Sequence, residues 1–189
     1  MPRPPLLPVL DWRAVCQTGK AYPEWLAAAE DSTHADRIEA ARVSLLLPED
    51  ALAAIKGLER DVHVAAIAED WCGDVVRFVP VLQRLADESG RAQVRYLSRE
   101  QHLDVFARFL TNGGEALPKF VFLNDAFVEC GNWGPMPESC RRLIARGKAL
   151  GDIPAARKLV SERYAADPEC KEAVAELIGL FRLAAARTL

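Results

Sequence analysis

Hydrophobic residues recur along the chain with two different spacings. Short apolar runs bounded by charged residues predict buried strands over residues 62–68, 93–97, 119–124 and 127–131. Apolar residues three or four positions apart predict helices over residues 72–88, 101–111 and 137–147. This order predicts two parallel strands joined by a helix, then an antiparallel hairpin turning at Asn124-Asp125. We therefore expect an α/β fold with a central mixed four-stranded sheet, βαβ followed by ββα, flanked by helices.

Helical patterns also occupy both ends of the chain. Short helices are predicted near residues 11–17, from Pro23, after Thr33 and from Pro48. After Gly151 two more helices are split by Asp167-Pro168. The second has one apolar face made of Cys170, Ala173, Val174, Leu177, Ile178, Phe181 and Ala185. We expect an N-terminal helical extension (1–59), a core domain (60–150) and a C-terminal helical extension (151–189) packed on the same core.

Composition narrows the class of protein. Half of the 189 residues are hydrophobic, which is enough for a sizeable core. The 24 basic and 27 acidic residues are dispersed, so no basic stripe predicts nucleic-acid binding. The proline-broken start over residues 1–10 does not resemble a signal peptide, and no apolar run reaches membrane-spanning length. We expect a cytoplasmic protein that contacts neither nucleic acid nor membrane.

The five cysteines stand at positions 16, 72, 130, 140 and 170, in no Cys-x-x-Cys or Cys/His ligand spacing. This scatter argues against a disulfide framework and against a metal site, and it favours a reducing compartment. Cys72 differs from the others because it lies where the strand 62–68 gives way to the helix 72–88. Unpaired N–H groups and the helix dipole at such a junction favour a thiolate, so Cys72 is the candidate nucleophile.

Several residues around Cys72 resemble the thioredoxin family over residues 62–134. They are Trp71-Cys72-Gly73, Pro80 inside the following helix, Leu117-Pro118 after the helix breaker Asn112-Gly113-Gly114, and Gly134 sixteen residues beyond Pro118. The flanking sequences resemble a bacterial subgroup with helical additions at both ends. The resemblance implies a thioredoxin-like fold and a cis-proline at Pro118. It also implies a docking surface formed by Trp71, the Leu117 backbone and Gly134.

The departures from that family concern the resolving step. Val75 stands where the second cysteine of the motif would be, so a dithiol shuttle within the motif is excluded. Ala66 stands where similar thioredoxins keep a buried, proton-handling carboxylate. Asp74 replaces a proline of the motif, and its charge would raise the pKa of a nearby thiol, against the effect of the helix.

Other residues near the motif have more than one interpretation. Trp71 is expected to be exposed for docking rather than buried. Arg99 follows the strand 93–97 and could attract a carboxylate or stabilise a thiolate, or it could be a solvated surface residue. For His102 the helix surface is favoured over a proton-donor role. Cys130 is expected to end the fourth strand, too far away for direct resolution without movement, and Cys140 to be a small helix residue.

Three functional hypotheses follow. The first is a monothiol thiol-disulfide oxidoreductase in which Cys72 attacks mixed disulfides of proteins, with glutathione as co-substrate and no bound cofactor. The second is a redox-inactive module that uses Trp71, Pro118, Trp133 and the added helices to hold a protein partner or a second copy. The third is iron–sulfur carriage through Cys72 and an external thiol, on a resemblance to monothiol glutaredoxins. The Trp71 context and the added helices argue against it.

Overall fold

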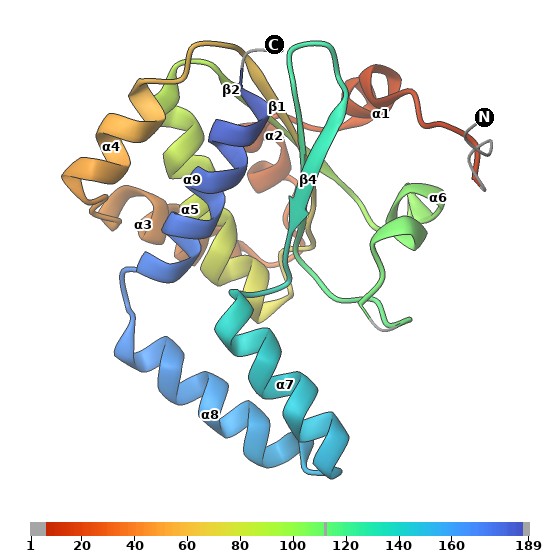
Figure 1. Ribbon diagram of the computed structural model, residues 1–189. Coiled ribbons are helices and arrows are strands. Elements are labelled where there is room, and N and C mark those ends of the chain that lie inside the picture. Colours follow the sequence, from red (N-terminus) through yellow and green to blue (C-terminus); the bar gives the residue numbers. More distant parts are fainter. Residues whose placement is uncertain (1–6, 112, 187–189) are drawn as a thin grey trace.

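The computed structural model describes residues 7–111 and 113–186. Its sheet contains β1 (Val62–Ile67), β2 (Ala92–Leu97), β3 (Lys119–Leu123) and β4 (Glu129–Trp133) in the order β2-β1-β3-β4 (Figure 1). β1 is parallel to β2 and antiparallel to β3, and β3 is antiparallel to β4. This arrangement confirms the predicted α/β fold with a mixed four-stranded sheet. The first six residues, Asn112 of the predicted helix breaker and residues 187–189 lie outside the description.

Helices surround the sheet in the predicted order. They are α1 (Trp12–Thr18), α2 (Tyr22–Ala27), α3 (Ser32–Ser44), α4 (Glu49–Lys56), α5 (Gly73–Ser89), α6 (Leu103–Phe106), α7 (Glu138–Leu150), α8 (Ile153–Ala166) and α9 (Lys171–Ala184). Aspartates mark three of the starts: the side chains of Asp11, Asp31 and Asp152 accept hydrogen bonds from backbone amides of α1, α3 and α8. These caps satisfy N–H groups that have no partner within the helix.

Most predicted elements differ from the structure by one to three residues at an end, but two differ in a way that changes the path of the chain. The fourth strand spans Glu129–Trp133 rather than residues 127–131. The Asn124 side chain accepts hydrogen bonds from the amides of Ala126 (3.0 Å) and Val128 (2.9 Å), and Phe127 has a φ of 61°. The turn is therefore longer than the two residues predicted. The predicted helix over residues 101–111 is only α6 and one 3-10 turn ending at residue 109, after which a bridge between Thr111 and Gly114 redirects the chain.

Both faces of the sheet are covered. Figure 1 shows α3, α4, α5 and α9 on one side of the sheet and α1 and α6 on the other. β1 and β3 are almost entirely buried, as expected for central strands covered on both faces. One hydrophobic cluster includes fully buried residues of the added helices, such as Ile38 of α3, Ile55 of α4 and Phe181 of α9. Burying each such side chain contributes about 2 kcal/mol. The added helices therefore complete the core.

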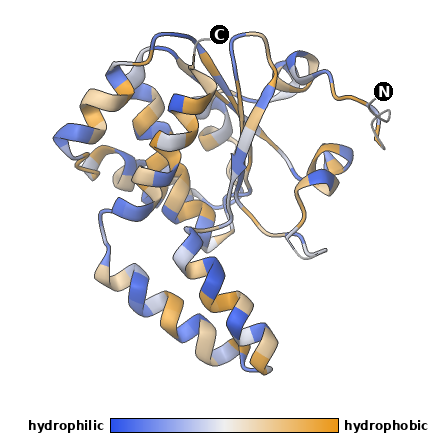
Figure 2. Cartoon of the chain, in the orientation of Figure 1, coloured by the Kyte–Doolittle hydropathy of each residue, from blue (hydrophilic) through white to orange (hydrophobic). Residues whose placement is uncertain are grey.

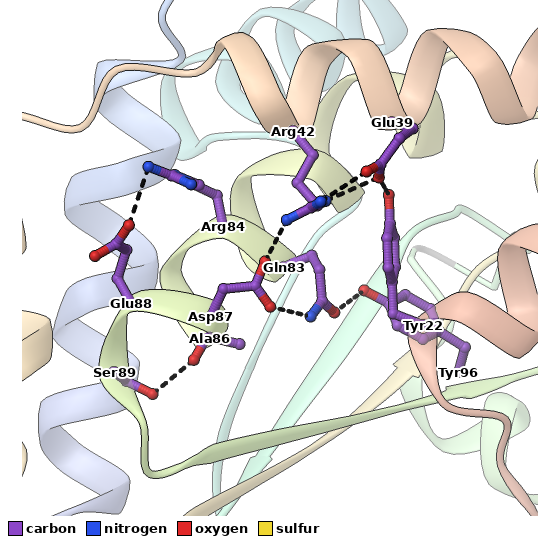
Figure 3. Close-up of polar contacts among 10 residues, drawn as sticks. All are labelled: Tyr22, Glu39, Arg42, Gln83, Arg84, Ala86, Asp87, Glu88, Ser89 and Tyr96. Atoms are coloured by element: carbon purple, nitrogen blue, oxygen red, sulfur yellow. Dashed lines mark hydrogen bonds and ion pairs between the residues drawn. The ribbon is translucent and has the colours of Figure 1, made fainter.

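A polar network fastens α3 to the C-terminal half of α5 (Figure 3). Arg42 forms 2.6 Å ion pairs with Glu39 and with Asp87. Gln83 donates to Asp87 at 2.7 Å and accepts from the hydroxyl of Tyr96 at 3.0 Å. These groups satisfy one another far from the helix start that carries Cys72, so we assign the network a structural role.

The helices α7 and α8 form a hairpin that projects from the body of the molecule (Figure 1). They pack closely, since a Cβ placed on Gly147 would lie 2.4 Å from the Cβ of Ala156. Figure 2 shows hydrophilic and hydrophobic residues on both helices of the hairpin. At its base, Glu176 and Glu172 of α9 accept hydrogen bonds from the first two amides of α7, at 2.8 and 3.1 Å. α9 thus packs on the core and holds the hairpin in place.

Candidate functional site

Cys72 is the N-cap residue of α5, directly before its first residue, Gly73. Its carbonyl accepts the first hydrogen bond of the helix, from Val76 (3.0 Å), and its own N–H donates to the carbonyl of Glu69 (3.1 Å). The side chain is partly buried, and its thiol donates to the carbonyl oxygen of Leu117, with 3.7 Å between sulfur and oxygen. The sulfur therefore lies between the positive end of a helix and the loop that opens β3.

That loop contains a cis peptide bond between Leu117 and Pro118. Both residues are buried, so the loop meets Cys72 through its backbone. Gly134 packs against it with a φ of 119°, and a Cβ there would lie 2.0 Å from the carbonyl oxygen of Pro118. Only glycine fits this position. By contrast, a Cβ on Gly73 would meet no heavy atom within 4 Å.

Lys119, the first residue of β3, supports the same loop from within the core. It is only 6% exposed, and its ammonium donates to the carbonyl of Gly134 at 2.9 Å. Burial, together with the charge of Arg141, lowers the pKa of Lys119 to about 8. This position of Lys119 could not be predicted, because a lysine in a short strand carries no signal of burial.

Trp71 and Arg99 lie together beside the motif. Trp71 is 51% exposed, and the Arg99 guanidinium lies 5.6 Å from the centre of its ring. Arg99 also forms a 3.0 Å ion pair with Glu115, and its backbone N–H donates to Glu69 at 2.6 Å. Arg99 therefore joins the motif loop to the loop before Pro118, and no contact between Arg99 and Cys72 is found among the described residues.

Trp133 and His102 both have structural roles. Trp133 is 2% exposed, stacks on Phe120, and donates its indole N–H to Glu176 at 2.5 Å. The hypothesis that Trp133 docks a partner is therefore wrong, because the side chain is part of the core. The ring nitrogens of His102 lie 2.8 Å from the Thr18 hydroxyl and 3.0 Å from the Ser98 carbonyl, at the start of α6.

Asp74 lies in the first turn of α5 and contacts the C-terminal part of the chain. The hydroxyl of Tyr164 in α8 donates to its carboxylate at 2.8 Å. Burial raises the pKa of Asp74, and the Tyr164 hydrogen bond opposes this effect. Arg77 strengthens the same junction by donating to the carbonyls of Tyr164 (3.0 Å) and Asp167 (2.5 Å). Nothing local in the sequence predicts that α8 lies beside the motif.

A groove with a volume of about 920 Å³ opens beside Cys72. The loop before Pro118 forms one side, and the facing sides of α7 and α8 form the other. Three cations, Arg141, Lys148 and Arg157, line it together with apolar residues such as Ile144 and Val160. The volume lies within the range of ligand pockets. These three residues could not be predicted from the sequence, because nothing in it places their helices beside Cys72.

The other thiols are less suited to exchange chemistry. Cys16, Cys140 and Cys170 are buried, and burial raises the pKa of each, to about 11 for Cys16. Burial also raises the pKa of Cys130, which lies near the start of β4 and not at a strand end as predicted. All five cysteines are free.

Two negative findings concern the described residues alone. No group of three or more His, Cys, Asp or Glu side chains in residues 7–111 and 113–186 is arranged to hold a metal ion. No helix in this part of the chain is both long enough and apolar enough to cross a membrane.

Comparisons with known proteins agree with the fold. A crystal structure of a protein of unknown function from Pseudomonas aeruginosa has a TM-score of 0.71 and 15% identity, covering 91% of this chain and 97% of that one. The crystal structure of an HIV epitope scaffold has a TM-score of 0.71 and 14% identity, covering 90% of this chain and 97% of the scaffold. These likenesses show the fold alone, and no curated protein matches the sequence. A family model described as thioredoxin matches residues 19–150, and the chain therefore belongs to the thioredoxin family.

Proposed function

We propose that the protein is a monothiol thiol-disulfide oxidoreductase that acts on mixed disulfides through Cys72. The observation that carries this proposal is the position of the Cys72 thiol. Cys72 is the N-cap residue of α5, and its thiol contacts the Leu117 carbonyl before cis-Pro118 and lines a large groove. Val75, which is fully buried, stands in the place of a second motif cysteine. Because the motif has no second thiol, we propose that an external thiol completes the reaction.

The exchange proceeds in two displacement steps. The Cys72 thiolate attacks one sulfur of a mixed disulfide, forming a new bond from Cys72 to that sulfur. The other sulfur leaves as a thiolate and takes up a proton. A second small thiol, which we propose is glutathione, then attacks the new disulfide and releases Cys72 as a thiolate. Each step consumes one thiolate and one disulfide and forms one of each, so no further oxidant, reductant or bound cofactor is needed.

The surroundings of Cys72 support docking of a disulfide-bearing protein. Trp71 offers an exposed aromatic surface next to the sulfur, and the backbone at Leu117 can pair with an extended peptide. The five free thiols agree with a reducing, cytoplasmic compartment. We further assign the chain to a bacterial subgroup of the family with a Trp-Cys-Gly-Asp motif and helical additions at both ends.

The test is removal of glutathione from a protein mixed disulfide. Wild type is expected to catalyse this reaction with glutathione present, and Cys72→Ser to abolish it. Cys130→Ser is the matched control, because Cys130 is also partly buried and is expected to leave the rate unchanged. The protein should fail in a dithiol insulin-reduction assay. Equal background rates for wild type and Cys72→Ser would overturn the proposal.

A second candidate is a binding module without redox turnover. The specific observation in its favour is the groove itself, whose size and charge suit a ligand whether or not Cys72 reacts. Its partners would be a protein or a second copy of the chain. Slow alkylation of Cys72 by iodoacetamide, at the rate of an ordinary free thiol, would favour this candidate over the enzyme.

A further inference from the structure

The groove beside Cys72 has an uneven charge balance. Arg141 and Lys148 of α7 and Arg157 of α8 line it, against two carboxylates, Asp74 and Glu115. Both carboxylates already have partners, because Tyr164 donates to Asp74 and Arg99 forms an ion pair with Glu115. The groove therefore has an excess of positive charge that its own carboxylates do not neutralise.

Two of the cations have no competing partner. In the described part of the chain, neither Lys148 nor Arg157 forms an ion pair or a side-chain hydrogen bond, and both are exposed. Arg141 lies deeper and makes a long contact, 3.4 Å, to the Gly134 carbonyl. Lys148 and Arg157 can therefore bind an incoming anion without losing an existing interaction.

The spacing of residues along α8 indicates how far Arg157 lies from the end of the groove that holds Cys72. Arg157 and Tyr164 lie seven residues apart on the side of α8 that lines the groove, which corresponds to about 10 Å along the helix. Tyr164 contacts Asp74 at the end of the groove that holds Cys72. A peptide advances about 3.3 Å per residue, so a carboxylate one or two residues from a reacting sulfur comes within reach of the long Arg157 side chain.

We propose that this groove binds a small anionic peptide thiol, of the size and charge of glutathione, with Lys148 and Arg157 contacting its carboxylates. The inference rests on the proposed function in one respect, since it names which half of the mixed disulfide becomes bonded to Cys72. The Cys72 thiolate attacks the sulfur of the anionic peptide, and the protein thiolate leaves and is protonated. A second anionic thiol then attacks the peptide's sulfur, releasing the Cys72 thiolate and a disulfide of the two small thiols.

Binding is tested separately from chemistry with S-methylglutathione, which cannot form a disulfide. Calorimetry on the folded Cys72→Ser protein is expected to detect binding that weakens as salt is added. Adding Arg157→Gln or Lys148→Gln should each weaken it about fivefold or more, the effect of roughly 1 kcal/mol. Lys158→Gln and Arg146→Gln are matched controls, because they remove the same charge from the same helices outside the groove. No binding, or equal effects of all four variants, would overturn the inference.

Chemistry provides the second arm. Wild type should release glutathione from a peptide mixed disulfide faster than it releases neutral 2-mercaptoethanol from the same peptide, and Arg157→Gln should reduce this preference. Exchange without any charge preference would retain the proposed function and overturn the inference. Binding of S-methylglutathione that depends on Arg157, without exchange by Cys72, would retain the inference and overturn the proposed function.

Discussion

The hydroxyl of Tyr164 donates a 2.8 Å hydrogen bond to Asp74 across 90 residues of sequence. Asp74 lies two residues after the candidate nucleophile, whereas Tyr164 lies in α8, beyond the part of the chain that the thioredoxin family model matches. The motif and the α7–α8 hairpin are thereby joined at one end of the groove. A C-terminal helix consequently shapes the surroundings of Cys72.

Tyr164→Phe should destabilise the fold. The substitution keeps the ring but removes the donor to a partly buried carboxylate, which costs about 1–3 kcal/mol. Urea denaturation measures this loss, and it should shrink when Asp74→Asn is already present. Tyr96→Phe is the control, because Tyr96 donates to the neutral side chain of Gln83 and its loss should cost less, about 1 kcal/mol. Equal losses in the two backgrounds would show that the bond contributes nothing.

Asp74 should also make stability depend on pH. Its pKa in the folded protein is raised above the ordinary 3.8, so in that range the folded state binds more protons than the unfolded state. The free energy of unfolding therefore falls as pH rises from 3.8 through the raised pKa, and the loss remains above it. Asp74→Asn should remove this component. The check is the difference between the two stability curves; a constant difference between pH 3 and pH 8 would contradict the assignment.

Lys119 should give the free energy of unfolding the opposite dependence on pH, in the alkaline range. Its pKa is about 8 in the folded protein, against 10.5 ordinarily, so the unfolded state binds more protons between these values. The free energy of unfolding should therefore rise from pH 8 to 10.5, by up to roughly 3 kcal/mol. Lys119→Met retains an apolar side chain of similar length and should lack this rise. Parallel curves for the two proteins would refute the prediction.

Gly134→Ala should disturb the loop that faces Cys72. A Cβ would lie 2.0 Å from the Pro118 carbonyl oxygen at a φ of 119°, so the loop must move, at a cost of roughly 3 kcal/mol. Exchange at Cys72 should slow as well. Gly73→Ala is the matched control in the motif, because its Cβ meets open space and should change stability by less than about 1 kcal/mol. Similar effects of the two variants would contradict this steric account.

The sequence predicted the individual helices and strands better than it predicted which of them lie side by side. The strand before Cys72 and the helix after it were predicted because apolar spacing and the charges around them are local signals. The burial of Lys119 and Trp133 could not be read in this way, since it depends on strands and on α9 packing around them. The cations of α7 and α8 were missed for the same reason. They lie beside Cys72 because the hairpin docks on Asp74 and Arg77 and, at its base, on α9.

The missing motif cysteine offers a final test of the active-site assignment. Val75→Cys should restore a Cys-x-x-Cys motif one helical turn long, whose second sulfur would be buried beneath Cys72 as Val75 is now. The replacement removes little volume and should cost less than about 1.5 kcal/mol. We expect slow dithiol–disulfide cycling, because the fully buried Ala66 supplies no carboxylate to move protons, and faster cycling when Ala66→Asp is added. Mass spectrometry after mild oxidation checks for the disulfide between Cys72 and the new thiol. If it is absent from a folded Val75→Cys protein, the inferred geometry of the motif, and with it the role of Cys72, must be abandoned.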